Sequence, residues 1–300
     1  MWTCTNYFLP HKMSHENSIQ TNINQFAIIG ELYDSKESVQ TLTDLFTLSL
    51  LDFDVEAPRK LPEETEQPLT NDQILKLTSQ FPDPEALIRK LIHKDTCIVD
   101  FACGTGLVLE KIAPYIPQGK FIGVDISEAM LSKFNGRGEK LKSTYPDLTI
   151  QSVCGDIMDK QFDASELEKS ADVLLCSLAF HHLHEYKQVA QKLKTLVKPG
   201  GWIFIYDFYN EDNELPVSAA LAARGVSRHG LSIDEMNDCF KDGCRNVSSA
   251  REFKVKLWQE EEFVLSHCCL AITDHLEQYE KKGDLYCVEC SVILGVAQVV

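Results

Sequence analysis

The sequence predicts an α/β fold, in which a doubly wound, mostly parallel sheet follows an N-terminal helical region. Two observations favour it. From about residue 96 to residue 206, short apolar runs rich in β-branched and aromatic residues alternate with amphipathic stretches, as in successive βαβ units. The first run, 96–101, ends in a turn of small residues that leads directly into an apolar helix from Leu107. Strand, glycine turn and helix in this order are typical of the nucleotide-binding unit of such sheets.

Seven runs are expected to form strands, five in the alternating part and two candidates after Asp207, where the pattern changes. Ser127 is expected to cap the helix after the second strand, and that helix to be interrupted at 135–138. Ser232, with Glu235 three residues later, predicts a capping box. The expected strands are 96–101, 121–125, 148–153, 171–176, 202–206, 252–257 and 286–296.

Composition divides the chain into three expected parts. Residues 1–22 are polar and predict a mobile tail, and residues 23–95 predict a helical cap that prolines interrupt within 57–69. Residues 96–300 form the sheet domain, with expected insertions at 209–232 and 259–284. Within the second insertion, 260–282 predicts a helix.

The charge and the cysteines limit the classes of function. A net charge of −16 disfavours a nucleic-acid partner and binding to anionic membranes. No apolar run is long enough for membrane insertion, and the first residues lack the apolar core of a secretory signal. Eleven cysteines in such a chain indicate reduced thiols and a cytoplasmic location. The single CxxC, 287–290, lies in an expected strand that points its two thiols to opposite sides, so no metal site is expected.

Polar side chains follow four of the expected strands. Because the carboxyl ends of parallel strands meet at one edge of a sheet, we expect these groups to lie together. Asp100 would repel a phosphate and suits a cation or an amino group, and Leu109 stands where a dinucleotide loop requires its third glycine. Asp125, about twenty residues beyond the glycine turn, is suited to accept from ribose hydroxyls. Asp156 could accept from an adenine amino group.

The segment Asp100-Phe101-Ala102-Cys103-Gly104-Thr105-Gly106 resembles motif I (D-x-G-x-G-x-G) of the class I S-adenosylmethionine (SAM) methyltransferases, with Ala102 at the first glycine. The likeness extends from about 96 to 257 and includes 123–127, 155–157, 181–183 and 198–201. It implies a Rossmann-like sheet whose seventh strand is antiparallel, and SAM as the cofactor. The cofactor-binding residues that it implies are Asp100, Ala102, Cys103, Gly104, Thr105, Gly106, Asp125, Ile126, Asp156, Ile157 and Ser177.

Within that family, the sequence is similar to the small-molecule branch, which includes ubiquinone, menaquinone, thiol and secondary-metabolite methyltransferases. This implies in-line methyl transfer to a small, partly apolar acceptor at S, O or C. His181 and His182 are the candidate bases, because their place is beside the reacting methyl in this family and their pKa range is suitable. The alternative for either is a histidine that bonds to backbone at the start of a helix. Tyr33 and Phe208 are candidate substrate-binding residues or ordinary core.

Two other functions stay open at this point. The long acidic N-terminal region suits a protein methyltransferase that docks a basic protein partner. Ala102 also leaves room for a SAM-binding regulatory protein without turnover. Arg224, Arg228 and His229 suit either recognition of an anionic substrate group or a solvated face.

Overall fold

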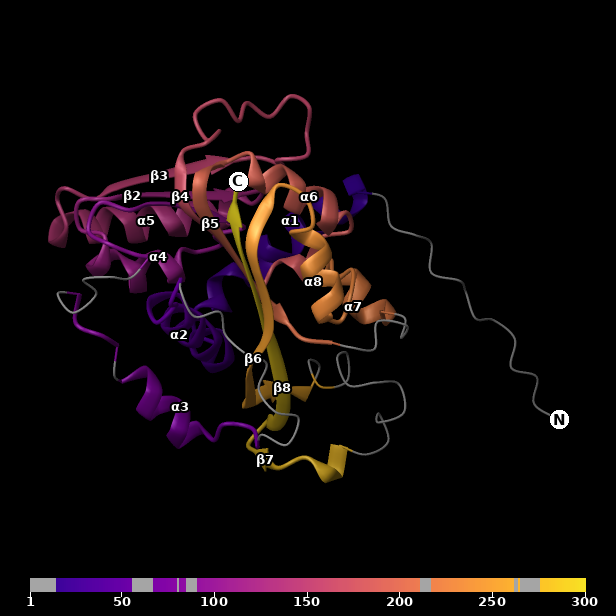
Figure 1. The fold of residues 1–300 in the computed structure, drawn as a ribbon. Coiled ribbons are helices and arrows are strands. Elements are labelled where there is room, and N and C mark those ends of the chain that lie inside the picture. The colour runs from indigo at the N-terminus through magenta and orange to yellow at the C-terminus, as the bar shows by residue number, and fades with distance from the viewer. Residues whose placement is uncertain are drawn as a thin grey trace.

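The computed structural model describes residues 15–55, 67–79, 81–84, 91–210, 217–261, 264 and 276–300. A twisted sheet with helices on both faces forms its centre (Figure 1). Its strands are β1 (Cys97–Phe101), β2 (Lys120–Asp125), β3 (Thr149–Cys154), β4 (Ala171–Ser177), β5 (Val197–Phe208), β6 (Cys244–Glu260), β7 (Lys281–Lys282) and β8 (Leu285–Val299). Its helices are α1 (His15–Tyr33), α2 (Glu37–Leu51), α3 (Asn71–Thr78), α4 (Leu107–Ile112), α5 (Glu128–Thr144), α6 (Tyr186–Lys194), α7 (Ala219–Ala223) and α8 (Ile233–Cys239), with 3-10 turns at η2 (Ala113–Tyr115), η3 (Phe180–His182) and η4 (Leu276–Gln278).

The strand order is β3-β2-β1-β4-β5-β8-β6, with the short β7 paired to β8. Strands β1 to β5 are parallel, whereas β8 runs antiparallel to both β5 and β6. The predicted doubly wound, mostly parallel sheet with an antiparallel last strand is therefore confirmed. The chain reverses its winding at β1, which lies between β2 and β4, and a ligand site is expected in the crevice at that point.

Each face of the sheet has its own apolar core. Helices α2, α4 and α5 pack on one face through residues such as Phe46, Leu109 and Phe134, while α6 and α8 pack on the other through Leu193 and Met236. Strands buried on both faces are the reason that β1, β4 and β5 are almost continuously apolar in sequence. These two cores hold the carboxyl ends of the strands in register.

The structure corrects two expectations about helices and tails and confirms two predicted caps. α1 begins at His15, so residues 15–22, predicted as part of a mobile tail, form the first turns of a helix; residues 1–14 lie outside the described part. α5 runs without the predicted interruption at 135–138, because Gly138 lets the helix approach Ile150 of β3. The caps at Ser127 and Ser232 are confirmed, the second as a full capping box with Glu235.

The second insertion also differs from its prediction. β6 continues to Glu260 and β7 occupies Lys281–Lys282, so the ends of the expected 260–282 helix are strand. Residues 262–263 and 265–275 between them lie outside the described part, as do 57–66 of the proline-interrupted stretch and 85–90 of the expected helical cap. None of the helices that the structure describes is both long and apolar enough to cross a membrane.

Candidate functional site

A cavity opens at the carboxyl ends of β1, β2 and β4, and helix α1 closes its other side. It contains about 1200 Å³ of space, counting its open mouth. Most of the residues predicted from the four strand ends line this one cavity. They are Asp100, Ala102, Cys103, Gly104, Thr105, Asp125, Ile126, Asp156, Ser177 and His182, together with Tyr33 from α1.

Asp100 is a buried carboxylate at the end of β1. It is 1% exposed, and its Oδ2 has no hydrogen-bond partner among the described residues. Burial raises the pKa of Asp100 well above its ordinary value, and the nearby charge of Asp125 adds to the effect. A buried acceptor without a partner is costly, so this atom is suited to a ligand that brings a donor or a positive charge.

The turn after Asp100 adopts a backbone that favours glycine. Gly104 and Gly106 have φ of +54° and +84°, and Ala102, which stands where motif I has a glycine, has φ of +58°. An alanine in the left-handed region costs about 1–2 kcal/mol per residue, so the loop keeps its shape at a small cost. A Cβ at Gly104 would meet no atom within 4 Å, which leaves open space for a ligand against the backbone.

Asp125 at the end of β2 holds this turn in place. Its Oδ2 accepts from the Gly104 N–H at 2.9 Å, and its Oδ1 accepts from the Ser127 N–H at 2.8 Å. Burial raises the pKa of Asp125, although hydrogen bonds from backbone N–H groups oppose the rise. Each oxygen keeps a second lone pair, so the carboxylate can still accept from a pair of ligand hydroxyls.

An ion-pair cluster fastens the C-terminal end of α1 to the glycine turn. Asp34 Oδ1 accepts from the Thr105 hydroxyl at 2.6 Å, and Asp34 Oδ2 lies 2.9 Å from Arg137 Nη2. Arg137 also pairs with Glu110 through Nε at 2.7 Å and donates to the Thr105 carbonyl. α1 is thus joined both to the loop that faces the cavity and to α5.

The other end of α1 meets the third strand end. His15 Nε2 lies 2.7 Å from Asp156 Oδ2, while Asp156 Oδ1 accepts from the Met158 N–H. The oxygen that we expected to receive an adenine amino group is therefore paired with α1. Between the two ends, Ser18, Ile19, Asn22 and Phe26 also line the cavity.

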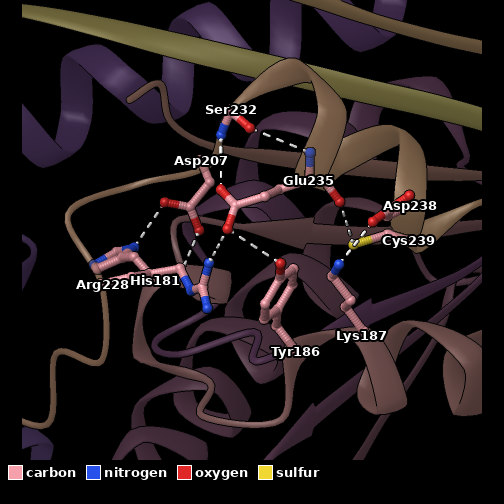
Figure 2. A network of polar contacts seen from close by, with 9 residues as sticks. All are labelled: His181, Tyr186, Lys187, Asp207, Arg228, Ser232, Glu235, Asp238 and Cys239. Atoms are coloured by element: carbon pink, nitrogen blue, oxygen red, sulfur yellow. Dashed lines mark hydrogen bonds and ion pairs between the residues drawn. The ribbon is translucent and has the colours of Figure 1, made fainter. Parts of the chain in front are cut away.

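The two adjacent histidines have different surroundings. His181 is buried, its Nδ1 lies 2.7 Å from Asp207 Oδ1, and its backbone N–H donates to Asp207 Oδ2 (Figure 2). His182 lines the cavity, and its ring makes an edge contact with Phe26 at 5.4 Å between centroids. In a single 3-10 turn, neighbouring side chains point in different directions, so only one of the pair faces the cavity. His181 does not line the cavity.

Three further predicted residues do not line the cavity. Gly106 begins α4, where a Cβ would lie 2.8 Å from Phe134, so it serves the turn and not the ligand surface. Ile157 is 2% exposed and belongs to the apolar core on the α6 face of the sheet. Phe208 packs its ring on His181, with 5.1 Å between centroids, and is absent from the residues that line the cavity.

Sequence reasoning predicted a helical cap from residue 23 and Tyr33 in the pocket, but it missed the N-terminal half of α1, which also lines the cavity. Its cavity-facing residues recur every three or four positions, as on one face of a helix, but Ser18 and Asn22 make that face polar. The hydrophobic pattern that identifies a buried helix face was therefore weak. The spacing of His15, Ser18, Asn22 and Phe26 was the only available signal.

Comparison with known proteins agrees with this geometry. Residues 99–205 match the family model described as a methyltransferase domain. An uncharacterized methyltransferase of Schizosaccharomyces pombe is 30% identical over 169 residues, 55% of this chain and 58% of the relative. The demethylmenaquinone methyltransferase of Symbiobacterium thermophilum is 38% identical over 106 residues, 35% of this chain and 39% of the relative. The malonyl-[acyl-carrier protein] O-methyltransferase of Halalkalibacterium halodurans is 29% identical over 140 residues, 45% and 49% of the two chains.

The fold, the glycine turn and these matches define a Rossmann-like methyltransferase domain. Residues 99–205 thus carry a methyltransferase domain, and the relatives that the chain matches include methyltransferases of demethylmenaquinone and of the malonyl-[acyl-carrier protein]. The resemblance of the sequence to the class I methyltransferases implies SAM as the cofactor. The chain spans about half the length of the curated relatives that it matches.

The residues of the cavity fit this cofactor. Asp100 Oδ2 offers a buried acceptor to an ammonium group, Asp125 offers lone pairs to ribose hydroxyls, and Gly104 leaves room beside the backbone. Ile126 gives an apolar wall for a flat base. Among the residues that the structure describes, no three His, Cys, Asp or Glu side chains are grouped so as to hold a metal ion.

Proposed function

We propose that the protein transfers a methyl group from SAM to a small, partly apolar acceptor by in-line displacement. One observation carries the proposal. The cavity that holds Asp100 and Asp125 at one side extends under α1 to Phe26, Tyr33 and His182. A cofactor-sized site that continues into an aromatic-walled space beneath a helix is suited to a metabolite and less to a polypeptide segment.

In this proposal, side chains of the protein bind the cofactor and orient it. Asp100 pairs with a positively charged amino group, and Asp125 accepts from two hydroxyls, so that the reacting end of the cofactor faces the acceptor space. When bound, SAM supplies a methyl group on a positively charged sulfur. That sulfur becomes neutral when the methyl leaves it, so it is already a good leaving group. The remaining task is alignment and exclusion of water, which lowers a barrier by as much as about 7–11 kcal/mol in favourable intramolecular cases.

His182 is the proposed general base. Its ring lies in the cavity beside Phe26, and Ser18 and Ser227 donate to its carbonyl at 3.4 and 3.0 Å. Because both neighbours fix the backbone of this residue, the ring is oriented before the acceptor arrives. A hydroxyl or an acidic carbon would lose its proton to His182, whereas a thiol near its pKa needs less help.

Burial makes Tyr33 a hydrogen-bond donor in this space. It raises the pKa of the Tyr33 phenol to about 12, and the charges of Asp34, Asp125 and Asp207 act in the same direction. At neutral pH the phenol keeps its proton and can contact the acceptor but cannot serve as a base. We also propose the cytosol as its location and exclude nucleic acid as the acceptor, because of the cysteine content and the acidic charge.

The test is incubation of the full chain with SAM labelled in its methyl group and a deproteinised cell extract. We expect label in low-mass products, and about 10²–10⁴-fold slower labelling of a hydroxyl or carbon acceptor with a His182→Ala variant. Label on a protein band in a whole extract would indicate the protein methyltransferase instead. SAM binding without labelled product from either extract would indicate a regulatory protein and would contradict the proposal.

A further inference from the structure

We propose that Asp207 is a positioning residue for methyl transfer, which acts through His181 to hold the His182 ring at the cavity. This inference rests on the methyl transfer proposed above and on the role given there to His182. Three features carry it: the hydrogen bonds of Asp207, the loop that packs on the same turn, and the backbone conformation of Leu178. All three concern the segment 178–182, which leads from β4 through the 3-10 turn η3.

Asp207 is a fully buried carboxylate near the carboxyl end of β5. Its Oδ2 accepts from the backbone N–H of His181 at 3.0 Å, and its Oδ1 lies 2.7 Å from His181 Nδ1, as Figure 2 shows. Nδ1 is the donor in this pair, since a carboxylate offers only lone pairs. A carboxylate taken out of water is costly unless hydrogen bonds compensate it. Here those bonds fix both the main chain and the ring of the residue directly before His182.

The loop between α7 and α8 holds the other side of the same turn. The backbone N–H groups of Ser227 and Arg228 donate to the His181 carbonyl at 2.8 and 3.2 Å. The Ser227 hydroxyl donates to the His182 carbonyl at 3.0 Å. The N–H of His181 is therefore bound by Asp207 and its carbonyl by this loop, so the turn is fixed on both sides.

The side chain of Arg228 keeps that loop in place. Its Cζ lies 3.8 Å from the centroid of the Tyr186 ring, and its Nη1 lies 2.8 Å from Glu235 Oε1 (Figure 2). Glu235 also accepts from the Tyr186 hydroxyl at 3.2 Å and from the Ser232 N–H at 3.1 Å. Arg228, a candidate for anion recognition from sequence, does not line the cavity, and it instead joins the loop to α6 and α8.

Leu178 shows that the segment is held in a conformation that its sequence does not favour. Its φ is +54°, in the left-handed region that is costly for a residue with a Cβ. It lines the cavity, and its N–H donates to the Tyr206 carbonyl at 2.7 Å. Strained backbone of this kind persists where the surrounding contacts over-determine it, and it gathers at functional sites. The bonds from Asp207 and from the loop provide that constraint.

The side chain that this arrangement places at the cavity is His182. It lines the cavity, and its ring makes an edge contact with that of Phe26, another lining residue. Asp207 and His181 do not line the cavity, so their role is to position and not to react. A base works only when it reaches the proton that it abstracts, and a misplacement of about 1 Å can cost about 10²-fold in rate.

The test uses the full chain, SAM labelled in its methyl group and a deproteinised cell extract. At saturating SAM, a dilution series of the extract gives a maximal rate of labelling and a half-saturating dilution, which correspond to kcat and KM. We expect Asp207→Ala to lower the maximal rate about 10- to 100-fold. The half-saturating dilution and the Kd for S-adenosylhomocysteine (SAH), the demethylated cofactor, should change less than about twofold.

Asp172→Ala is the matched control. Asp172 also binds a backbone N–H, that of Cys97 at 2.9 Å, and pairs with Lys198 at 2.7 Å, but it does not line the cavity. We expect this variant to keep the maximal rate within about twofold of the wild type. Equal maximal rates for Asp207→Ala and Asp172→Ala would overturn the assignment. A loss of SAH affinity in Asp207→Ala as large as its loss of rate would do the same, because it indicates a general loss of structure.

A double variant tests whether Asp207 acts through His182. In a His182→Ala background the base is absent, so Asp207→Ala should slow labelling by less than about twofold more. A further loss as large as that in the wild-type background would overturn the positioning role. Absence of any labelled product with the wild type would instead count against the proposed function.

A pair of variants at His181 gives the answer where Asp207→Ala does not fold. His181→Asn keeps an N–H donor the same number of bonds from the backbone as Nδ1, whereas His181→Leu removes the donor at similar bulk. We expect His181→Asn to have a maximal rate about tenfold above that of His181→Leu. Equal rates for the two variants would overturn the assignment.

Discussion

The two walls of the cavity differ in how they are built. The strand-end wall comes from residues 100–105, 125–126, 155–156, 177–179 and 182, which the parallel sheet brings to one edge. The opposite wall is one face of α1, a helix that lies outside the sheet and is attached through Asp34 at one end and His15 at the other. The first wall carries groups suited to the cofactor, and the second carries most of the groups suited to the acceptor.

This difference separates what is common to the family from what is particular to this chain. The strand ends hold the segment that resembles motif I, whose spacing follows from the βαβ unit to which it belongs. The α1 wall depends on contacts between residues more than seventy positions apart, such as Asp34 with Thr105. Specificity for the acceptor is therefore expected to change with α1, and cofactor affinity with the strand ends.

The largest effect is expected for His182→Ala, which removes the group at the junction of the two walls. We expect kcat to fall by about 10²–10⁴-fold for a hydroxyl or carbon acceptor, because a positioned base contributes that much. The Kd for SAH should change less than twofold. His93→Ala, on an exposed histidine that does not line the cavity, is the control.

His181→Ala is the comparison for His182→Ala, because His181 is the neighbouring histidine but does not line the cavity. It leaves Asp207, which is fully buried, without its side-chain partner, so the free energy of unfolding should fall by about 1–3 kcal/mol. A loss of stability for His182→Ala as large as that for His181→Ala, with kcat unchanged, would contradict the roles given to the two residues.

The next effect is on cofactor affinity and separates the strand-end wall from α1. Asp100→Asn removes the negative charge that pairs with the cofactor's amino group, and a hydrogen bond to a charged group contributes about 1.5–3 kcal/mol. We expect the Kd for SAH to rise by roughly 10- to 150-fold in calorimetry. An unchanged Kd would contradict the role of Asp100.

The free energy of unfolding of Asp100→Asn should also depend on pH differently from that of the wild type. Because the folded-state pKa of Asp100 is raised, the folded protein without cofactor binds this proton more tightly than the unfolded chain does. Stability contributed by the group is therefore lost as the pH rises from the ordinary carboxyl range through the raised pKa. We expect Asp100→Asn to be more stable than the wild type at pH 8, with a difference that shrinks towards pH 4.

A smaller effect is expected where α1 is fastened to the glycine turn. Asp34→Ala removes the bonds to Thr105 and Arg137 but leaves Arg137 paired with Glu110, so α1 should detach more often without unfolding the sheet. We expect a loss of about 1 kcal/mol in SAH binding, which is about fivefold in Kd. Lys36, two positions after Asp34, makes an exposed ion pair with Glu260. Lys36→Ala breaks that pair and should have no measurable effect on SAH binding.

The sheet and the strand-end wall could be predicted from sequence because both depend on local patterns. Short apolar runs identified the strands, and Asp100 and Asp125 stand at fixed distances from the glycine turn. Tyr33 and a helical cap from residue 23 were predicted, but the N-terminal half of the α1 wall was not, since Ser18 and Asn22 give its buried face no hydrophobic period. Ile157 and His181 are predicted in the site, but the residues that line the cavity are their neighbours Asp156 and His182. The sequence of a turn after a strand does not reveal which way each side chain points.

Hydrogen exchange of the full chain, with and without SAH, tests most directly whether the two walls form one site. We expect SAH to slow exchange in peptides from 97–106 and 120–127 and also in peptides from 15–33, because the ligand lies between the strand ends and α1. Protection limited to the strand ends would contradict the part given to α1. No protection in any of these peptides at saturating SAH would contradict the site itself.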